Sequence, residues 1–295
     1  MTNAVLVSLA VLLRIFSNPL GNVFQKQLTT KGHHPLLVNF LTFFLLSVVC
    51  FFIIPFIEWH KLQGQFWLYA LLGGIVGAIG NGFLVKALQK GDLSVLGPIN
   101  SYKSIVGIIF GIILLGEVPG LLGLLGIALI IYGSYYVLDT TEERFSLKLL
   151  KKSEIQFRLW AMILTAIEAV FVKKVILLSS TTTAFITWCC FGAFFSFLLL
   201  FLYRLDLKNE SKKIRSTDIT KYIFLIICIG IMQITTNYTF GHMAVGYALS
   251  LFQLSTIISV LLGHRIFKEK DIRKKLVGSV IMIIGSVLII VFKNK

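Results

Sequence analysis

Charged residues are scarce in this sequence of 295 residues: Asp, Glu, Lys and Arg together make up 14% of it, against roughly 25% in an ordinary soluble domain. Hydrophobic residues make up 57%. This composition excludes a soluble enzyme, a disordered tail protein and a disulfide-stapled domain. The apolar runs are continuous rather than alternating, so we expect membrane helices of about 20 residues rather than a transmembrane β-barrel.

Motifs for metal, cofactor and nucleotide chemistry are also missing. The four cysteines lie inside apolar runs without a CxxC spacing, and we interpret them as small apolar helix residues. His33 and His34 are not matched by a second cluster of metal ligands, and no glycine-rich loop ends in the Gly-Lys-Ser/Thr of a phosphate site. The sequence therefore predicts no metal, no cofactor and no ATPase activity of its own.

The apolar runs predict an all-α polytopic membrane protein with ten transmembrane helices. The predicted helices span residues 3–25, 36–58, 65–86, 93–115, 119–138, 157–175, 183–204, 221–243, 247–267 and 275–293. The longest polar segments are 139–156 and 205–220. The first of these is expected to be either an amphipathic surface helix or a solvated loop.

The segment 139–156 separates two similar halves, 1–138 and 157–295. Each half has an Asn about ten residues before a Gly that begins a helix, a Glu that ends that helix, and two glycines that follow the Glu by 9 and 16 residues. These positions are Asn81, Gly91, Glu117, Gly126 and Gly133 in the first half, and Asn237, Gly246, Glu269, Gly278 and Gly285 in the second. Because five helices per half is an odd number, the second half must insert upside down, as in many secondary transporters.

Lys and Arg are distributed unevenly between the two sides of the predicted bundle. Of the 28 basic residues, 21 fall near the loops that follow the odd-numbered helices, and five fall on the opposite side. The positive-inside rule places loops 139–156 and 205–220 in the cytoplasm and both termini on the other side. The net charge of +15 then reflects attraction to anionic lipid, and nucleic acid is not an expected partner.

Three charged residues lie near the centres of predicted helices: Arg14, Lys103 and Glu168. A charge at the bilayer centre costs at least about 2.5–3.5 kcal/mol, so such residues normally face the interior of the bundle and mark a transport pathway. The alternative is a buried ion pair or triad that only fixes helix packing.

Polar residues share helix faces with these charges. Asn18 and Asn22 follow Arg14 at intervals of four, and Asn100 precedes Lys103 by three. The predicted substrate-binding residues are Arg14, Asn18, Asn81, Asn100, Lys103, Gln233 and Asn237, with Glu168 as the coupling residue. Asn81 and Asn237 could equally form interhelical hydrogen bonds. Glu117 and Glu269 are expected to serve packing or interfacial hydrogen bonding.

The stretches 91–100, 111–117 and 123–133 resemble the EamA family of the drug/metabolite transporter superfamily, in which a helix, a Gly-Glu pair and a second helix recur. The second copy departs from the pattern, because Phe267-Lys268-Glu269 stands where Leu-Gly-Glu would be. The resemblance covers essentially the whole chain and implies a ten-helix transporter of small metabolites, often an exporter. Such proteins are usually drawn with cytoplasmic termini, opposite to the orientation that the charge count predicts.

We compared three functions. The favoured one is secondary active transport of a small polar metabolite across the cell membrane, with proton coupling or exchange. The central charges, net +1 when all are ionised, favour an anionic substrate such as an amino acid or organic acid.

The second function is a lipid-headgroup flippase, which a lateral opening to lipid would favour. The third, an integral-membrane transferase, lacks partnered catalytic groups, so we expect no enzyme. A small-molecule substrate and the lipid bilayer are the predicted partners, and a monomer suffices.

Overall fold

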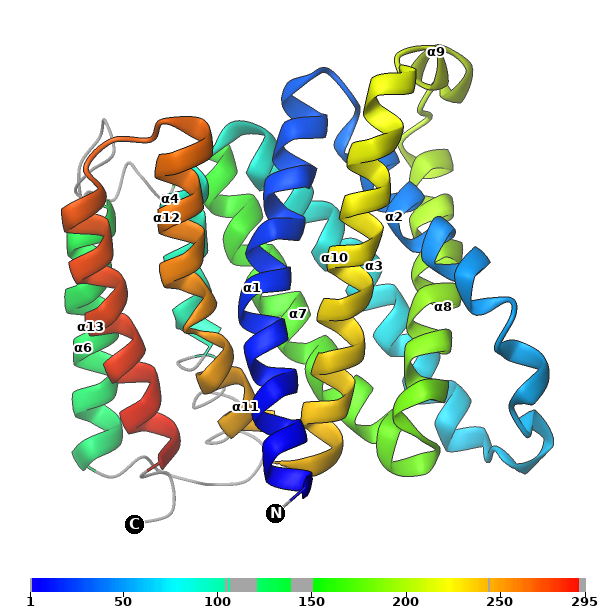
Figure 1. Cartoon of the computed structure of the whole chain (residues 1–295), viewed down its shortest axis with the longest axis horizontal. Coiled ribbons are helices and arrows are strands. Elements are labelled where there is room, and N and C mark those ends of the chain that lie inside the picture. The colour runs from blue at the N-terminus through cyan, green and yellow to red at the C-terminus, as the bar shows by residue number, and fades with distance from the viewer. Residues whose placement is uncertain (1, 104–105, 107–120, 139–150, 244, 292–295) are drawn as a thin grey trace.

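The computed structural model of the chain describes residues 2–103, 106, 121–138, 151–243 and 245–291. Every regular element among these residues is a helix. Figure 1 shows a bundle in which the long helices run roughly alongside one another. The start of α1 (Thr2–Thr30) and the end of α13 (Ile272–Val291) lie at the same end of this bundle.

The remaining helices follow the predicted order. In the first half they are α2 (Pro35–Cys50), α3 (Gly64–Lys90), α4 (Leu93–Ile99) and α6 (Leu121–Leu138). In the second half they are α7 (Ser153–Leu178), α8 (Thr181–Leu202), the short α9 (Leu207–Lys212), α10 (Ser216–His242), α11 (Val245–Phe252) and α12 (Ser255–Phe267). Side-chain caps fix some of these starts: Ser180 Oγ accepts a hydrogen bond from the backbone N–H of Thr183 and so begins α8.

Three predicted helices are shorter than expected or are interrupted. The predicted helix 36–58 ends at Cys50 and is followed by two short 3-10 turns, the first of which contains Pro55. The described part of 93–115 is α-helical over Leu93–Ile99, passes through a 3-10 turn at Asn100–Tyr102, and is α-helical again at Lys103 and Val106. The predicted helix 247–267 is divided between α11 and α12. Residues 107–115 lie outside the described range.

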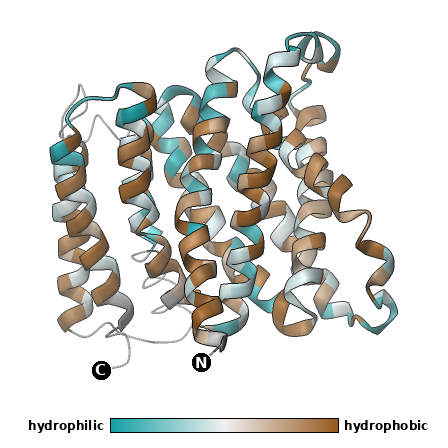
Figure 2. Ribbon diagram, viewed as in Figure 1, coloured by the Kyte–Doolittle hydropathy of each residue, from teal (hydrophilic) through white to brown (hydrophobic). Residues whose placement is uncertain are grey.

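The described helices expose many large hydrophobic side chains and bury several polar ones, although apolar clusters also fill the interior. Hydrophobic residues cover most of the length of the long helices, as Figure 2 shows. Many of their large side chains are exposed, whereas Asn22, Gln25, Asn39 and Asn237 are buried. Four described helical segments are long and apolar enough to cross a membrane: Ala4–Thr30, Gly64–Lys90, Thr181–Leu202 and Ser216–His242. Three shorter ones, Pro35–Cys50, Leu121–Val137 and Ser255–Phe267, are also apolar. The protein is therefore a multi-pass membrane protein.

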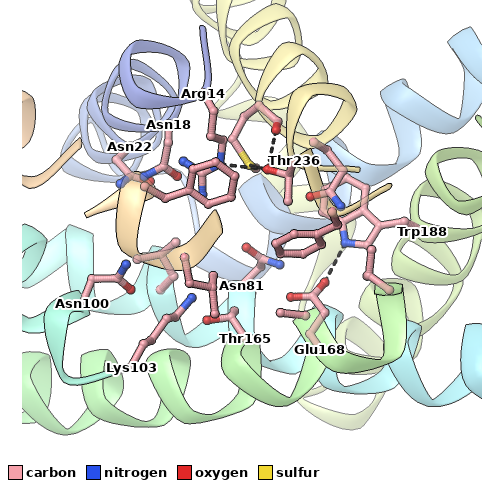
Figure 3. Close-up of a pocket in the computed structure, with 18 of the residues that line it drawn as sticks. Arg14, Asn18, Asn22, Asn81, Asn100, Lys103, Thr165, Glu168, Trp188 and Thr236 are labelled. Atoms are coloured by element: carbon pink, nitrogen blue, oxygen red, sulfur yellow. Dashed lines mark hydrogen bonds between the residues drawn. The ribbon is translucent and has the colours of Figure 1, made fainter. Parts of the chain in front are cut away.

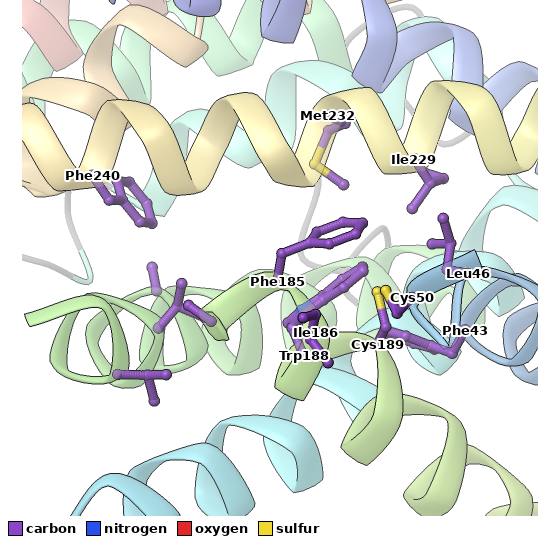
Figure 4. Close-up of a cluster of buried hydrophobic side chains, with 14 of the residues drawn as sticks. Phe43, Leu46, Cys50, Phe185, Ile186, Trp188, Cys189, Ile229, Met232 and Phe240 are labelled. Carbon is purple, nitrogen blue, oxygen red and sulfur yellow. The ribbon is translucent and has the colours of Figure 1, made fainter. Parts of the chain in front are cut away.

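Helices of the first half pack mainly against helices of the second. The principal pairs are α1 with α10, α2 with α8, α3 with α7, α3 with α8, α4 with α12, and α6 with α13. The α2–α8 contact buries an apolar cluster, shown in Figure 4, that includes Phe43, Cys50, Trp188 and Cys189. If the two halves are exchanged in order, α1–α10 and α3–α7 exchange places, and α2–α8, α4–α12 and α6–α13 each map onto themselves. The α3–α8 contact is an exception, because its counterpart, α2–α10, is less extensive.

Glycines bring α6 and α13 into backbone contact. A Cβ atom added to Gly133 would lie 2.6 Å from the carbonyl oxygen of Gly278, and one added to Gly285 would lie 2.6 Å from that of Gly126. These four glycines are the ones that recur at equal spacing in the two halves. Exchange of the halves converts the Gly133–Gly278 contact into the Gly285–Gly126 contact. Small residues of this kind allow membrane helices to approach closely.

We predict that Gly133→Ala and Gly278→Ala each lower the stability of the protein. The new methyl group meets backbone atoms of the facing helix, which cannot rotate away, and overpacking of this kind costs about 1–3 kcal/mol. The measurement is the melting temperature in detergent. Gly64→Ala is the control, since a Cβ at Gly64 meets nothing within 4 Å. Equal melting temperatures for all three variants would contradict the prediction.

A buried ionic cluster, which we call the Glu269 clasp, ties four helices together at the opposite end of the bundle from the termini. Glu269 accepts hydrogen bonds from the backbone N–H groups of Leu93 and Ser94, both at 2.8 Å, and from Lys26 Nζ at 2.9 Å. Lys275 Nζ donates to Ser94 Oγ at 2.8 Å. The clasp thereby joins α1, α4, the end of α12 and α13. This agrees with the hydrogen-bonding role predicted for Glu269, whereas Glu117 lies outside the described residues.

The environment of the clasp keeps Glu269 ionised. Burial acts to raise the pKa of its carboxyl group, but the charge of Lys26 and the hydrogen bonds from Ser94 outweigh burial and hold the pKa below its ordinary value. A lowered folded-state pKa contributes stability that is present above the pKa of the unfolded chain and is lost as the pH falls through the folded-state pKa. The clasp is therefore expected to weaken in acid.

We predict that Glu269→Gln destabilises the protein by about 3–5 kcal/mol, because it removes the carboxylate 2.9 Å from buried Lys26 and leaves only the more distant Asp92, at 4.0 Å. The matched control is Glu58→Gln, which breaks the exposed Glu58–Lys61 pair and should change little. Melting temperatures measured between neutral and acidic pH test both the destabilisation and its pH dependence. The difference in melting temperature between native protein and Glu269→Gln should become smaller in acid. A Glu269→Gln protein as stable as the Glu58→Gln control would exclude this role.

Candidate functional site

A cavity of about 100 Å³ lies inside the bundle between α1, α3, α7 and α10. Arg14, Asn18 and Asn22 project into it from α1, as Figure 3 shows. They lie on one face because residues four apart on an α-helix stand one above the other. The cavity can hold several water molecules or a small polar solute.

Most of the predicted site residues line this cavity. They are Arg14, Asn18, Asn81, Asn100, Lys103 and Gln233, together with Glu168. Asn237 does not line it. This residue is fully buried, accepts a hydrogen bond from Gln233 Nε2 at 2.9 Å and donates one to the carbonyl oxygen of Thr181. In the structure Asn237 therefore joins α10 to the start of α8 and orients Gln233.

Arg14 is only partly satisfied by protein groups. Its Nε donates to Thr236 Oγ1 at 2.9 Å, and its guanidinium carbon lies 4.8 Å from the centre of the Phe252 ring. Its Nη1 atom is buried and, in the described part of the chain, has no hydrogen-bond partner. Asn22 Oδ1, about two turns along α1, is likewise buried and has no hydrogen-bond partner among the described residues. Buried polar atoms are rarely left without a partner, so these atoms mark a place for water or a ligand.

Glu168 lies across the cavity from Arg14, on α7 (Figure 3). Its Oε1 accepts a hydrogen bond from Trp188 Nε1 at 2.6 Å. Gly77 on α3 makes room for this carboxylate, because a Cβ at that position would overlap Glu168 Oε1. No ion pair joins Glu168 to Arg14 or Lys103 among the described residues. The charged triad that was the alternative to a transport site is thus not formed there.

Arg158 is a cavity residue that the sequence analysis missed. It was counted with the loop cations because helix 157–175 was expected to begin beside it. The helix begins at Ser153 instead, and Arg158 is buried and donates from Nε to the carbonyl oxygen of Leu96 at 2.7 Å. Its spacing to Thr165 and Glu168 places all three on one face of α7. This spacing is visible in the sequence and could have identified Arg158 as a residue on the same helix face as Glu168.

Two interrupted helices contribute to the cavity. Asn100 and Lys103 follow the end of α4, and Phe252 ends α11. The two interruptions contact each other: Gln253 Oε1 accepts a hydrogen bond from Ser101 Oγ, and Gln253 Nε2 donates to the carbonyl oxygen of Asn100, both at 3.4 Å. Interruptions of this kind expose backbone groups at membrane depth only where they line a cavity or are buried in protein.

The charge of the cavity is positive. Arg14, Lys103 and Arg158 face a single carboxylate, Glu168, which gives a formal net charge of +2 when all four groups are ionised. The sequence had predicted +1 without Arg158. Five side-chain amides add both donors and acceptors: Asn18, Asn22, Asn81, Asn100 and Gln233. This combination suits a small polar molecule that carries a negative group.

Known proteins resemble the chain in sequence and in fold. Its sequence matches the family described as "EamA-like transporter family" twice, over residues 6–138 and 152–291. A Sinorhizobium protein described as "Uncharacterized transporter in cobO 3'region" is 33% identical over 82 residues, which are 26% of this chain and 57% of that protein. The match thus spans little more than half of that relative.

A solved structure described only as "Crystal structure of protein" has the same fold. It superposes with a TM-score of 0.66 and 15% sequence identity, over 95% of this chain and 96% of that one. The two family matches together take in nearly all of the chain. The chain belongs to the EamA-like transporter family, part of the drug/metabolite transporter superfamily.

Proposed function

We propose that this membrane transporter is a secondary active carrier of a small anionic metabolite, an amino acid or an organic acid. The observation that carries the proposal is the pair of buried, unpartnered polar atoms on α1, Arg14 Nη1 and Asn22 Oδ1, beside a cavity of net positive charge. A substrate carboxylate satisfies the guanidinium, and a neighbouring donor on the substrate satisfies the amide oxygen.

The architecture that we propose is ten membrane-spanning helices in two inverted repeats, residues 1–138 and 157–295, joined by 139–156. Two observations support this arrangement. Most of the principal helix pairs are preserved when the two halves are exchanged, and the glycine contacts between α6 and α13 are symmetric. The cavity is lined by residues of α1, α3 and the segment after α4 from one half, and by residues of α7, α8, α10 and α11 from the other. A site between two inverted halves can face either side of the membrane in turn as the halves rock.

Glu168 is the residue that we propose couples transport to protons or to exchange. A coupling group must lose and regain a proton while it alternates between substrate and water. Glu168 is the carboxylate in the cavity lining, and it is held by a neutral donor, Trp188, rather than by a permanent cationic partner. A carboxyl group in this setting remains free to change its protonation state when the substrate arrives.

We predict that Arg14→Gln and Arg158→Gln each reduce uptake of the anionic substrate. A hydrogen bond to a charged group contributes about 1.5–3 kcal/mol, so the KM should rise roughly ten- to hundredfold. The measurement is uptake into liposomes from a panel of labelled amino acids, organic acids, sugars and nucleosides. Arg265→Gln, at an exposed position near the end of α12, is the control. Uptake of an anion unchanged by Arg14→Gln would refute the proposed site, and labelled phospholipid moving in place of solutes would favour a flippase.

For the coupling role, Glu168→Gln should retain the fold, lose accumulation driven by a pH gradient, and keep exchange of internal for external substrate. The amide preserves the size of the side chain and can still accept the hydrogen bond from Trp188, so only the titratable group is removed. Uptake in liposomes with and without a pH gradient distinguishes the two activities. A folded Glu168→Gln protein that still concentrates substrate along the proton gradient would end the coupling hypothesis.

The proposed orientation places the α9 end of the bundle in the cytoplasm and both termini outside it, in the cell membrane. A single cysteine at Ser211, in a protein without its native cysteines, should react with an impermeant thiol reagent only after the cells are opened. A cysteine at His60, an exposed position in the link from α2 to α3, should react in intact cells, since Figure 1 shows this link at the other end of the bundle. The reverse pattern of labelling would show that the chain is inserted the other way round.

A further inference from the structure

A second cavity, of about 470 Å³, lies at the end of the bundle that carries α9. It is lined by Lys31, His33, Lys212, Lys213, Arg215, Thr217 and Asp218, and it shares no residue with the central cavity. The turn between α1 and α2 forms one wall. The link from α9 to α10 forms the other, and Figure 1 shows both at the same end of the molecule.

Asp218 is the acidic residue of this lining, and its carboxylate is already hydrogen-bonded to neighbouring groups. Asp218 accepts hydrogen bonds from Lys31 Nζ at 2.6 Å, from His33 Nε2 at 3.2 Å and from the backbone N–H of Arg215 at 3.2 Å. The Tyr222 hydroxyl lies 3.3 Å from the other ring nitrogen of His33. Asp218 and His33 are both buried, so this network forms a fixed wall of the cavity.

The remaining cations exceed the negative charge around them. Lys213 pairs with Glu210 in an exposed contact, while Lys212 and Arg215 are exposed cations for which no ion pair is formed in the described part of the chain. Cations gathered around a shared hollow repel one another, and an anion placed between them relieves that repulsion. A phosphate group suits the site because it offers several oxygens to ammonium and guanidinium donors.

An apolar stripe runs from the rim of this cavity along α10. Ile219, Ile223 and Ile227 follow Arg215 at intervals of four residues, and each is about half exposed, at 53%, 51% and 49%. They therefore lie on one face of the helix beneath Arg215. Figure 2 shows hydrophobic residues over much of α10 below its polar start. A molecule with an anionic head and apolar chains matches the cavity and the stripe together, whereas a soluble phosphate uses only the cavity.

We propose that this cavity binds the phosphate headgroup of an anionic membrane phospholipid, whose acyl chains lie along Ile219, Ile223 and Ile227. Basic pockets beside membrane helices bind such headgroups, and each Lys or Arg near the surface strengthens the attraction to anionic lipid. The bound lipid screens the cations and holds the α1–α2 turn against the α9–α10 link. The proposal concerns lipid binding alone and stands apart from the identity of the transported substrate.

The test compares lipid retention by two triple variants. Purified protein is reconstituted in phosphatidylcholine nanodiscs with increasing phosphatidylglycerol, and native mass spectrometry counts the phosphatidylglycerol retained. In Lys212→Gln/Lys213→Gln/Arg215→Gln we expect affinity for phosphatidylglycerol to fall at least about tenfold. The control, Lys268→Gln/Lys270→Gln/Arg273→Gln, removes the same charges from exposed positions at the same end of the bundle and should retain the lipid as the native protein does. Equal retention by the two variants would overturn the proposal.

Two further experiments distinguish a bound phospholipid from a soluble phosphate anion. Inorganic phosphate and pyrophosphate at millimolar concentration should fail to displace phosphatidylglycerol if the acyl chains contribute to binding. Ile223→Ser, which interrupts the stripe without changing any charge, should weaken phosphatidylglycerol retention. Displacement by inorganic phosphate, or an Ile223→Ser protein that retains the lipid unchanged, would overturn the assignment to a membrane lipid. Circular dichroism confirms that each variant compared is folded.

Discussion

The desolvated guanidinium of Arg14 is the constraint on which the centre of this structure depends. A cation in the interior of a membrane protein is costly unless polar groups surround it. Thr236 and the ring of Phe252 supply only part of that environment. The remaining part is a cavity between the two halves of the chain, lined by amides, two further cations and Glu168. The interruptions at the ends of α4 and α11 lie beside this cavity, where Gln253 Nε2 donates a hydrogen bond to the carbonyl oxygen of Asn100.

Around this open centre, the bundle is held by tighter contacts elsewhere. The glycines of α6 and α13 bring two backbones together, and the Glu269 clasp fixes α1, α4, α12 and α13 to one another at one end. Helix pairs that join the two halves surround the cavity, so movement of one half against the other changes its shape. A polar cavity between the two halves is the feature on which the carrier proposed above depends.

The sequence predicted the parts of the structure that depend on periodicity and composition. The polar face of α1, the recurring glycines and the central position of Glu168 could all be found by spacing, because helical geometry fixes which residues share a face. The interruptions at Asn100 and Gln253 could not, since hydropathy does not register the loss of backbone hydrogen bonds inside an apolar run. Arg158 was missed because its role depended on a helix boundary four residues earlier than expected. The different environments of Asn81 and Asn237 depend on tertiary neighbours that no local pattern contains.

The account rests most heavily on the claim that the cavity is completed by an anionic ligand. Binding to the folded state alone raises stability by RT ln(1 + [L]/Kd), so the melting temperature of the purified protein reports occupancy without transport. Small carboxylates should raise the melting temperature, while their uncharged amides and cationic analogues should not. In Arg14→Gln the carboxylate shift should disappear, although the unliganded protein remains folded. A carboxylate shift that is as large in Arg14→Gln as in the native protein, or a shift given only by cationic analogues, would contradict the account.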